Sequence, residues 1–156
     1  MIYSLGTGTR TIDEFIRIIK DKRIEAIVDV RRFPTSRFEQ FKKGNFSKTC
    51  VEQKIEYLYL GDELGGYRKG GYEAHARTNE FQSGIERLKA LADKKTICIV
   101  CAETLPWKCH RRFIAQTLST QGYEVVHILD KKHILPPRNL NKATEFHRNI
   151  QKNRNS

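Results

Sequence analysis

Short apolar runs alternate with helical patterns over most of this chain. Five runs rich in β-branched residues predict strands, at residues 2–5, 26–30, 55–60, 96–100 and 124–128. Between them, apolar residues spaced three or four apart predict helices, at 12–22, about 45–54, about 78–93 and 106–121. The element order is therefore βαβαβαβαβ, which predicts a mostly parallel sheet with helices on both faces.

Local signals mark the ends of some of these elements. Thr11 is the expected N-cap of the first helix, with Glu14 three residues later in a capping-box pattern. Asn45 or Ser47 is the expected N-cap of the second helix. Residues 61–72 hold five glycines, so we expect a mobile surface loop there.

These patterns predict a single three-layer α/β domain over residues 1–130, Rossmann-like, with about five strands. The length of 156 residues suits one domain. Residues 131–156 hold seven Lys or Arg and one acidic residue, which predicts a basic C-terminal extension that is partly disordered. In open sheets of this kind, ligands bind beyond the carboxyl ends of the strands.

Composition and charge narrow the class of protein. No run approaches the ~18 apolar residues of a membrane helix, and the N-terminus lacks the pattern of a signal peptide. We therefore expect a cytoplasmic protein without a membrane partner. Four cysteines are too few for a disulfide framework, so we expect reduced thiols. The net charge of +11 favours a polyanionic partner, nucleic acid or a nucleotide.

Polar residues follow the first two predicted strands. Gly6 and Gly8 are candidates to hold a phosphate on backbone N–H groups, although a plain strand–helix turn explains them equally well. Asp29 must be paired or functional, because unpaired burial of a carboxylate is costly. Arg31 is its expected partner, or else binds phosphate together with Arg32.

The fourth strand leads into a second group of candidates. Glu103 is expected to be a general acid or base if Trp107 screens it from water; the alternative is a cap on the next helix. Tyr67, in the glycine-rich segment, is a candidate substrate contact. Cys101 and Cys109 leave three interpretations open: a nucleophile, a redox pair, or two small buried residues.

Cys109 is the better thiolate candidate of the two cysteines. It is expected in the first turn of a helix beside Lys108 and Arg111, which would favour the thiolate. His110 and Arg111 are candidates for binding a phosphate or another part of the substrate. The spacing of these residues matches no standard zinc site, and the Arg of a rhodanese-type loop is missing six residues after Cys101. The sequence therefore predicts neither a metal nor a cofactor.

Five separate motifs stand out along the chain. They are Asp29-Val-Arg31 with Pro34 and Ser36, Tyr57 through Leu64-Gly65-Gly66, Cys101-Ala-Glu103, Cys109-His110-Arg111 with Ala115, and Gly122 with His127-Ile128. Together they resemble the family called domain of unknown function 488, over nearly all of residues 1–130. The resemblance implies a compact α/β fold and a shared polar site but no settled reaction. Similar sequences usually carry a His where this chain has Thr7, so any chemical role of that His is lost or replaced here.

Three functions follow from these residues. The first is an enzyme acting on nucleic acid or a nucleotide-like substrate, in which Glu103 or Asp29 performs acid–base chemistry such as cleavage of an N-glycosidic bond. The second is a non-catalytic nucleic-acid-binding module. The third is thiol chemistry at Cys101 and Cys109.

Overall fold

The predicted strands form the middle layer of the molecule. In residues 1–136, which the computed structural model describes, the strands are β1 (Ile2–Gly6), β2 (Ala26–Asp29), β3 (Glu56–Tyr59), β4 (Ile97–Cys101), β5 (Val125–Ile128) and β6 (Ile134–Leu135). They form one six-stranded sheet in the order β3-β2-β4-β1-β5-β6. The first five strands pair in parallel, and β6 pairs antiparallel with β5. The prediction of a mostly parallel α/β sheet is confirmed.

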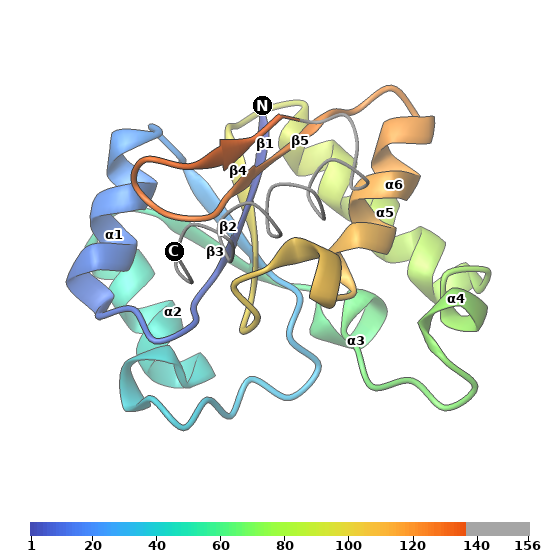
Figure 1. The fold of residues 1–156 in the computed structure, drawn as a ribbon, viewed down its shortest axis with the longest axis horizontal. Helices are drawn as coiled ribbons and strands as arrows, with labels where there is room; N and C mark the ends of the chain where they lie inside the picture. The colour runs from blue at the N-terminus through green and yellow to red at the C-terminus, as the bar shows by residue number, and fades with distance from the viewer. Residues whose placement is uncertain (137–156) are drawn as a thin grey trace, which may run out of the picture.

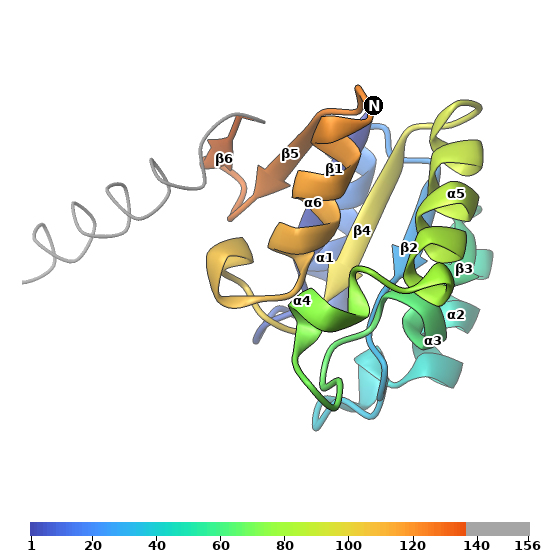
Figure 2. The same ribbon diagram turned by 90° about the vertical axis from the view of Figure 1, so that its right-hand side faces the viewer.

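Helices cover both faces of this sheet. They are α1 (Ile12–Asp21), α2 (Lys43–Glu52), α3 (Gly61–Leu64), α4 (Tyr72–His75), α5 (Asn79–Ala92) and α6 (Arg111–Thr120), with 3₁₀ turns at Glu39–Phe41 and Pro106–Lys108. Helices α1 and α2 lie on one side of the strands, and α5 and α6 lie on the other (Figure 1). In Figure 2 the side with α5 and α6 faces the viewer, and these two helices lie in front of the strands. The three-layer arrangement follows from the alternation of strands and helices.

Each face of the sheet has its own hydrophobic core, and β4 contributes to both. All five residues of β4 are buried. Ile97, Ile99 and Cys101 belong to the core that includes residues of α5 and α6. Cys98 and Val100 belong to the core that includes residues of α1 and α2. Because side chains alternate along a strand, Cys101 is directed to the α6 side of the sheet, away from Cys98.

One predicted helix cap is confirmed and another is wrong. The Thr11 side chain accepts a hydrogen bond from the N–H of Glu14 at 3.1 Å, as the capping pattern predicts. Helix α2, however, begins at Lys43, before both Asn45 and Ser47. The 3₁₀ turn before it leads directly into the helix, and the Asn45 side chain donates instead to the backbone oxygen of Glu39 at 2.9 Å.

The glycine-rich segment after β3 contains helical turns where a loop was predicted. Its first residues form α3, in which Gly61 and Leu64 are buried. A Cβ at Gly61 would lie 2.1 Å from the backbone oxygen of Arg31, so glycine is needed for this close approach. The buried Leu64 side chain belongs to the core and stabilises this helical turn. The prediction of a loop was based on the glycine content and did not take this burial into account.

The sheet continues beyond residue 130, the expected domain boundary, because β6 lies at Ile134–Leu135. The remainder of the predicted basic extension, residues 137–156, lies outside the described residues.

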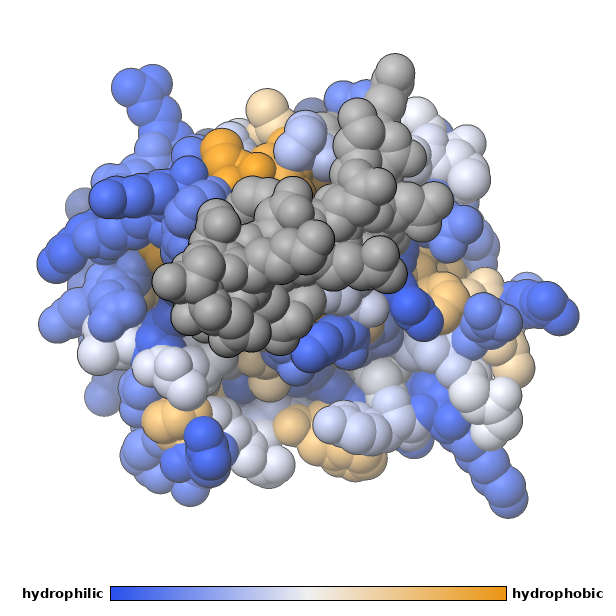
Figure 3. Space-filling model, in the orientation of Figure 1, coloured by the Kyte–Doolittle hydropathy of each residue, from blue (hydrophilic) through white to orange (hydrophobic). Residues whose placement is uncertain are grey.

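On the face shown in Figure 3, hydrophilic residues predominate among the coloured atoms and hydrophobic areas are small. Within residues 1–136, no helix combines the length and the apolar composition needed to span a membrane.

Candidate functional site

A pocket of about 600 Å³ opens beyond the carboxyl ends of β2 and β4. Three segments line it: residues 31–36 after β2, residues 66–72 between α3 and α4, and residues 101–110 after β4. The segments that follow β2, β3 and β4 leave the sheet at the same end, the lower one in Figure 1. The pocket is therefore where parallel strands in an open α/β sheet place a ligand.

Cys101 and Cys109 lie side by side at the inner wall of this pocket. Their Sγ atoms are 3.0 Å apart, and the side chains are among the buried ones, with exposed fractions of 2% and 9%. Cys101 is the last residue of β4, and Cys109 follows the Pro106–Lys108 turn in extended conformation. The prediction that Cys109 lies inside the first helical turn is wrong, because α6 begins at Arg111.

His110 lies next to the sulfur of Cys109 and is held in a defined orientation. Its Nδ1 is 3.5 Å from Cys109 Sγ, and its Nε2 is 3.0 Å from the backbone oxygen of Val30. A carbonyl oxygen only accepts hydrogen bonds, so Nε2 carries a proton and Nδ1 faces the sulfur. A Cβ at Gly66 would lie 3.0 Å from Nδ1, which shows how closely the Gly65-Gly66 segment packs on this ring.

Arg111 places a buried positive charge behind the two cysteines. Its side chain is only 1% exposed. The guanidinium donates hydrogen bonds to Ser4 Oγ at 3.0 Å and to the backbone oxygen of Glu103 at 2.5 Å, both neutral groups. Its backbone N–H points to Cys109 Sγ at 3.5 Å. A buried cation needs a compensating negative charge, and an ionised Cys109 supplies one.

The pKa values of the two cysteines move in opposite directions. A hydrogen bond from the Cys101 thiol, with further contributions from His110 and Arg111, lowers the pKa of Cys109 well below its usual range. Burial raises the pKa of Cys101 well above its usual range, and the hydrogen bond to Cys109 raises it further. These opposite shifts favour a thiolate at Cys109 and a neutral thiol at Cys101 that donates to it, in preference to the backbone oxygen of Glu103 at 3.4 Å.

Ser4 and His127 extend the hydrogen-bond chain behind Arg111. Ser4 Oγ lies 2.5 Å from Nδ1 of His127. Burial, and then the charge of Arg111, lower the pKa of His127 to about 4, so this imidazole is neutral near pH 7. His127 is buried and hydrogen-bonded, as expected of a structural histidine.

Asp29 and Arg31 form a buried, bidentate ion pair. Arg31 Nε lies 2.9 Å from one carboxylate oxygen of Asp29, and Arg31 Nη2 lies 2.8 Å from the other. Tyr57 donates to the same carboxylate at 2.5 Å, and Arg31 Nη1 donates to the backbone oxygen of Phe41 at 2.6 Å. Asp29 is 0% exposed. This geometry matches the structural alternative for Asp29, since both of its oxygens are engaged within the protein.

The turn at Gly6 and Gly8 packs against the loop after β4. The N–H of Thr7 donates to the backbone oxygen of Cys101 at 2.8 Å, and the N–H of Gly8 donates to that of Ala102 at 2.9 Å. These two N–H groups are thus engaged within the protein. A Cβ at Gly6 would lie 2.1 Å from a backbone oxygen of the same loop, so glycine permits the close approach of β1 and this loop.

Glu103 is an exposed residue on the pocket wall. Its Oε1 accepts a hydrogen bond from the N–H of Leu105 at 3.1 Å, which is the capping type of contact. Arg32 and Tyr67 also line the pocket, and Arg32 Nη1 donates to the backbone oxygen of Tyr67 at 2.7 Å.

Sequence reasoning missed several residues of the site. Ser4 gave no signal because it lies inside a strand. Tyr72 and Arg68 also line the pocket. They belong to the glycine-rich segment 61–72, but no pattern in the sequence distinguished them from its other residues. The Tyr72 hydroxyl donates to the backbone oxygen of Leu64 at 2.7 Å, and its ring centroid lies 5.2 Å from that of His110. Tyr72 therefore helps to hold His110 beside the sulfur.

The described residues do not present a ready-made metal site. In residues 1–136, no three side chains among His, Cys, Asp and Glu converge as metal ligands would.

Comparison with known proteins gives one match, to the model of a protein family. Neither the curated proteins nor the solved structures contain a match. The model of the family described as domain of unknown function DUF488 matches residues 11–118, which is well over half of the chain. This segment runs from the cap of α1 to α6 and includes the Asp29–Arg31 pair, the Gly65-Gly66 segment and both cysteines of the pocket. The chain belongs to the DUF488 family.

Proposed function

We propose that this protein is an enzyme in which the thiolate of Cys109 attacks an anionic substrate bound in the pocket. One observation carries the proposal: Cys109 Sγ faces the pocket with the Cys101 thiol at 3.0 Å and His110 Nδ1 at 3.5 Å. A nucleophile, an adjacent base and a third group that orients the base are the usual parts of covalent catalysis. Here the third group is the backbone oxygen of Val30.

The same groups support a simple reaction. The thiolate forms a bond to an electrophilic centre of the substrate, and the leaving group departs with its electron pair. In the thiolate–imidazolium form of the Cys109–His110 pair, His110 Nδ1 carries the proton that the leaving group takes up, and the water that later displaces the sulfur returns a proton to Nδ1. Water or another acceptor then displaces the sulfur, and the thiolate returns. Cys101 takes part as a hydrogen-bond donor that keeps Cys109 ionised between these steps.

The charges around the pocket favour a negatively charged substrate. Arg32, Arg68 and Lys108 line it. Within residues 1–136, none of these three forms a salt bridge with a carboxylate. Arg32 and Arg68 donate to backbone oxygens, so neither charge is neutralised by an ion pair. Glu103 is the acidic residue of the lining, and the three positive side chains outnumber it. Positive side chains at a concave surface raise the local concentration of anions.

Alkylation with two reagents tests both parts of the proposal. Iodoacetate is anionic and iodoacetamide is neutral, and both react with thiolates. We expect Cys109 to be modified first near pH 6, and the rate ratio of iodoacetate to iodoacetamide to exceed the ratio for free cysteine. Lys108→Ala lowers this ratio, whereas Lys94→Ala, an exposed lysine away from the pocket, leaves it unchanged. Peptide mass spectrometry identifies the modified residue. If Cys109 is modified no faster than the buried Cys98, the proposal that Cys109 is the nucleophile is wrong.

A second candidate function uses Glu103 in place of the thiolate. The observation in its favour is that the Glu103 carboxylate lines the same pocket. In this candidate the carboxylate acts as acid or base on a nucleotide-like substrate, as the sequence suggested. Turnover of nucleosides or damaged DNA that survives Cys109→Ser and disappears in Glu103→Gln would favour it over the thiolate enzyme.

A further inference from the structure

Two exposed aromatic rings form part of the pocket wall. Phe33 is 62% exposed and Tyr67 is 87% exposed, although large aromatic side chains gain free energy from burial. Both rings line the pocket that contains Cys109. Their centroids are 6.3 Å apart, with an angle of 37° between the ring planes. They come from different segments, one after β2 and the other after α3, so the fold brings them together.

Arg32 connects these two segments. Its guanidinium carbon lies 5.4 Å from the centroid of the Phe33 ring, and its Nη1 donates to the backbone oxygen of Tyr67. Tyr67 has a φ of 58°, a left-handed conformation that is unfavourable for a residue with a side chain. Strained backbone of this kind persists where the surrounding structure holds it, often at ligand sites. The exposed position of Tyr67 is thus maintained by specific contacts.

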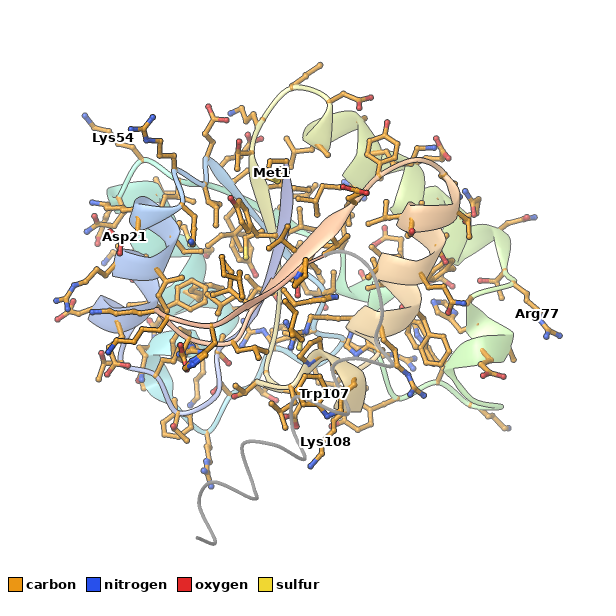
Figure 4. All side chains as sticks on the ribbon, turned by 45° about the horizontal axis from the view of Figure 1, so that its top comes forward. Met1, Asp21, Lys54, Arg77, Trp107 and Lys108 are labelled. Carbon is orange, nitrogen blue, oxygen red and sulfur yellow. The ribbon has the colours of Figure 1, made fainter. Side chains whose placement is uncertain are left out.

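Positive side chains accompany the rings around the pocket. Arg68 also lines the pocket, and its Nε donates to the backbone oxygen of Gly65 at 2.8 Å. Lys108 projects from the turn between β4 and α6, beside Trp107 (Figure 4). With Arg32, these side chains give three positive charges around one pocket that also has two aromatic rings in its wall.

We propose that this aromatic and cationic wall binds one nucleotide unit, with the base stacked on Phe33 and Tyr67 and the phosphate held by Arg32, Arg68 or Lys108. Every nucleobase has a planar π face that stacks on aromatic rings, and guanidinium groups bind phosphate oxygens. A lipid or an acidic peptide would use only the aromatic rings or only the positive side chains of this wall, not both. The inference rests on the proposed function, because it names the substrate class of the same pocket.

The pocket size and the overall charge agree with this ligand. A volume of about 600 Å³ falls within the range of sites for small ligands and cofactors. The chain carries a net charge of +11, which favours a polyanionic strand over a neutral ligand. A free nucleotide and a nucleotide within a single strand present the same chemistry to the wall, so the experiment must separate these two sources.

The test measures binding to the full chain carrying Cys109→Ser, so that binding is read without reaction. The probes are a fluorescein-labelled oligothymidylate, the same strand with abasic sites, and AMP as an unlabelled competitor, followed by fluorescence polarisation. Phe33→Ala and Tyr67→Gly each remove one ring, and glycine also accommodates the positive φ of residue 67. Val51→Ala is the matched control, because Val51 is 69% exposed on α2, outside the pocket.

We expect each ring variant to weaken oligothymidylate binding by about 5- to 150-fold, the usual effect of losing one stacked base. The control variant binds like the parent protein, and the abasic strand binds weakly. Competition by AMP at similar concentration identifies a free nucleotide as the ligand, and its absence identifies a strand. Equal binding of the abasic strand, no binding of any probe, or unchanged binding by both ring variants overturns the proposal.

This result is separable from the proposed function. The alkylation rate of Cys109 by iodoacetamide, measured in the protein that retains Cys109, is a separate readout that does not depend on nucleotide binding. Absence of nucleotide binding in the parent protein, with fast alkylation of Cys109, therefore removes only the substrate class. Slow alkylation of Cys109 with nucleotide binding intact removes only the proposal that Cys109 is the nucleophile.

Discussion

Replacing Cys101 with alanine tests whether Cys109 is a thiolate held by its neighbours. Cys101 Sγ lies 3.0 Å from Cys109 Sγ, and its hydrogen bond is the largest of the contributions that lower the pKa of Cys109. Alanine removes the donor and leaves the last residue of β4 small and apolar. We expect the pKa of Cys109 to rise in this variant, because its anion loses a partner.

The size of the change follows from the strength of one hydrogen bond to a charged group. Such a bond contributes about 1.5–3 kcal/mol, and one pKa unit corresponds to about 1.4 kcal/mol. The pKa of Cys109 should therefore rise by about one to two units. His110 and Arg111 remain in place, so the value stays below the pKa of about 8.5 of a free thiol.

The assay is the rate of alkylation of Cys109 by iodoacetamide as a function of pH, read by peptide mass spectrometry. The midpoint of the rate profile reports the ionisation of the thiol. Cys98→Ala is the matched control, because Cys98 lies on the same strand but belongs to the opposite core. A midpoint that stays unchanged in Cys101→Ala, or that moves as far in Cys98→Ala, refutes the reasoning. A midpoint near pH 8.5 in the unaltered protein refutes it as well.

Three further predictions concern stability. Cys109 ionises at lower pH in the folded chain than in the unfolded chain, so the ionised thiol stabilises the fold fully above about pH 8.5 and less as the pH falls. In urea unfolding, the difference in free energy of unfolding between the parent protein and Cys109→Ser should shrink by up to about 1.4 kcal/mol per pH unit. Tyr57→Phe removes the hydrogen bond to the buried Asp29 carboxylate and should lower the free energy of unfolding by about 1.5–3 kcal/mol, again measured with urea. Gly6→Ala places a Cβ 2.1 Å from a backbone oxygen and should lower the melting temperature, whereas Gly44→Ala meets nothing within 4 Å and should not.

The sequence predicted the long elements well because their signals are local. The apolar runs of β1, β2, β4 and β5 and the spacing in α1 and α5 are visible in short windows of the chain. Strand β6 has only two residues, Ile134–Leu135, and it exists because β5 offers an edge to pair with. That pairing depends on tertiary structure, so no window of the sequence contains it.

The site was predictable only where it follows strand ends. This rule located Cys101, Cys109 and His110, since the carboxyl ends of parallel strands meet at one edge. Ser4 escaped it, because its position depends on the register of the sheet. Register pairs Ser4 with His127 of β5, and the Ser4 side chain also meets the guanidinium of Arg111. Such a contact between residues more than a hundred positions apart has no counterpart in local sequence.

The buried charge of Arg111 supports the proposal of a thiolate at Cys109. Asp29 does not compensate it, because both oxygens of that carboxylate are bound by Arg31, with Tyr57 on one of them. Glu103 offers Arg111 only its backbone oxygen, while its exposed carboxylate caps a nearby N–H. Among residues 1–136, the other acidic groups that act on Arg111 are the thiols of Cys101, Cys109 and Cys98. Of these, Cys109 has the lowered pKa, and its sulfur accepts from the backbone N–H of that arginine. The hydrogen bond from Cys101 lowers the pKa of Cys109 most, and His110 and the fixed charge of Arg111 lower it further, so the proposed nucleophile is ionised before a substrate enters the pocket.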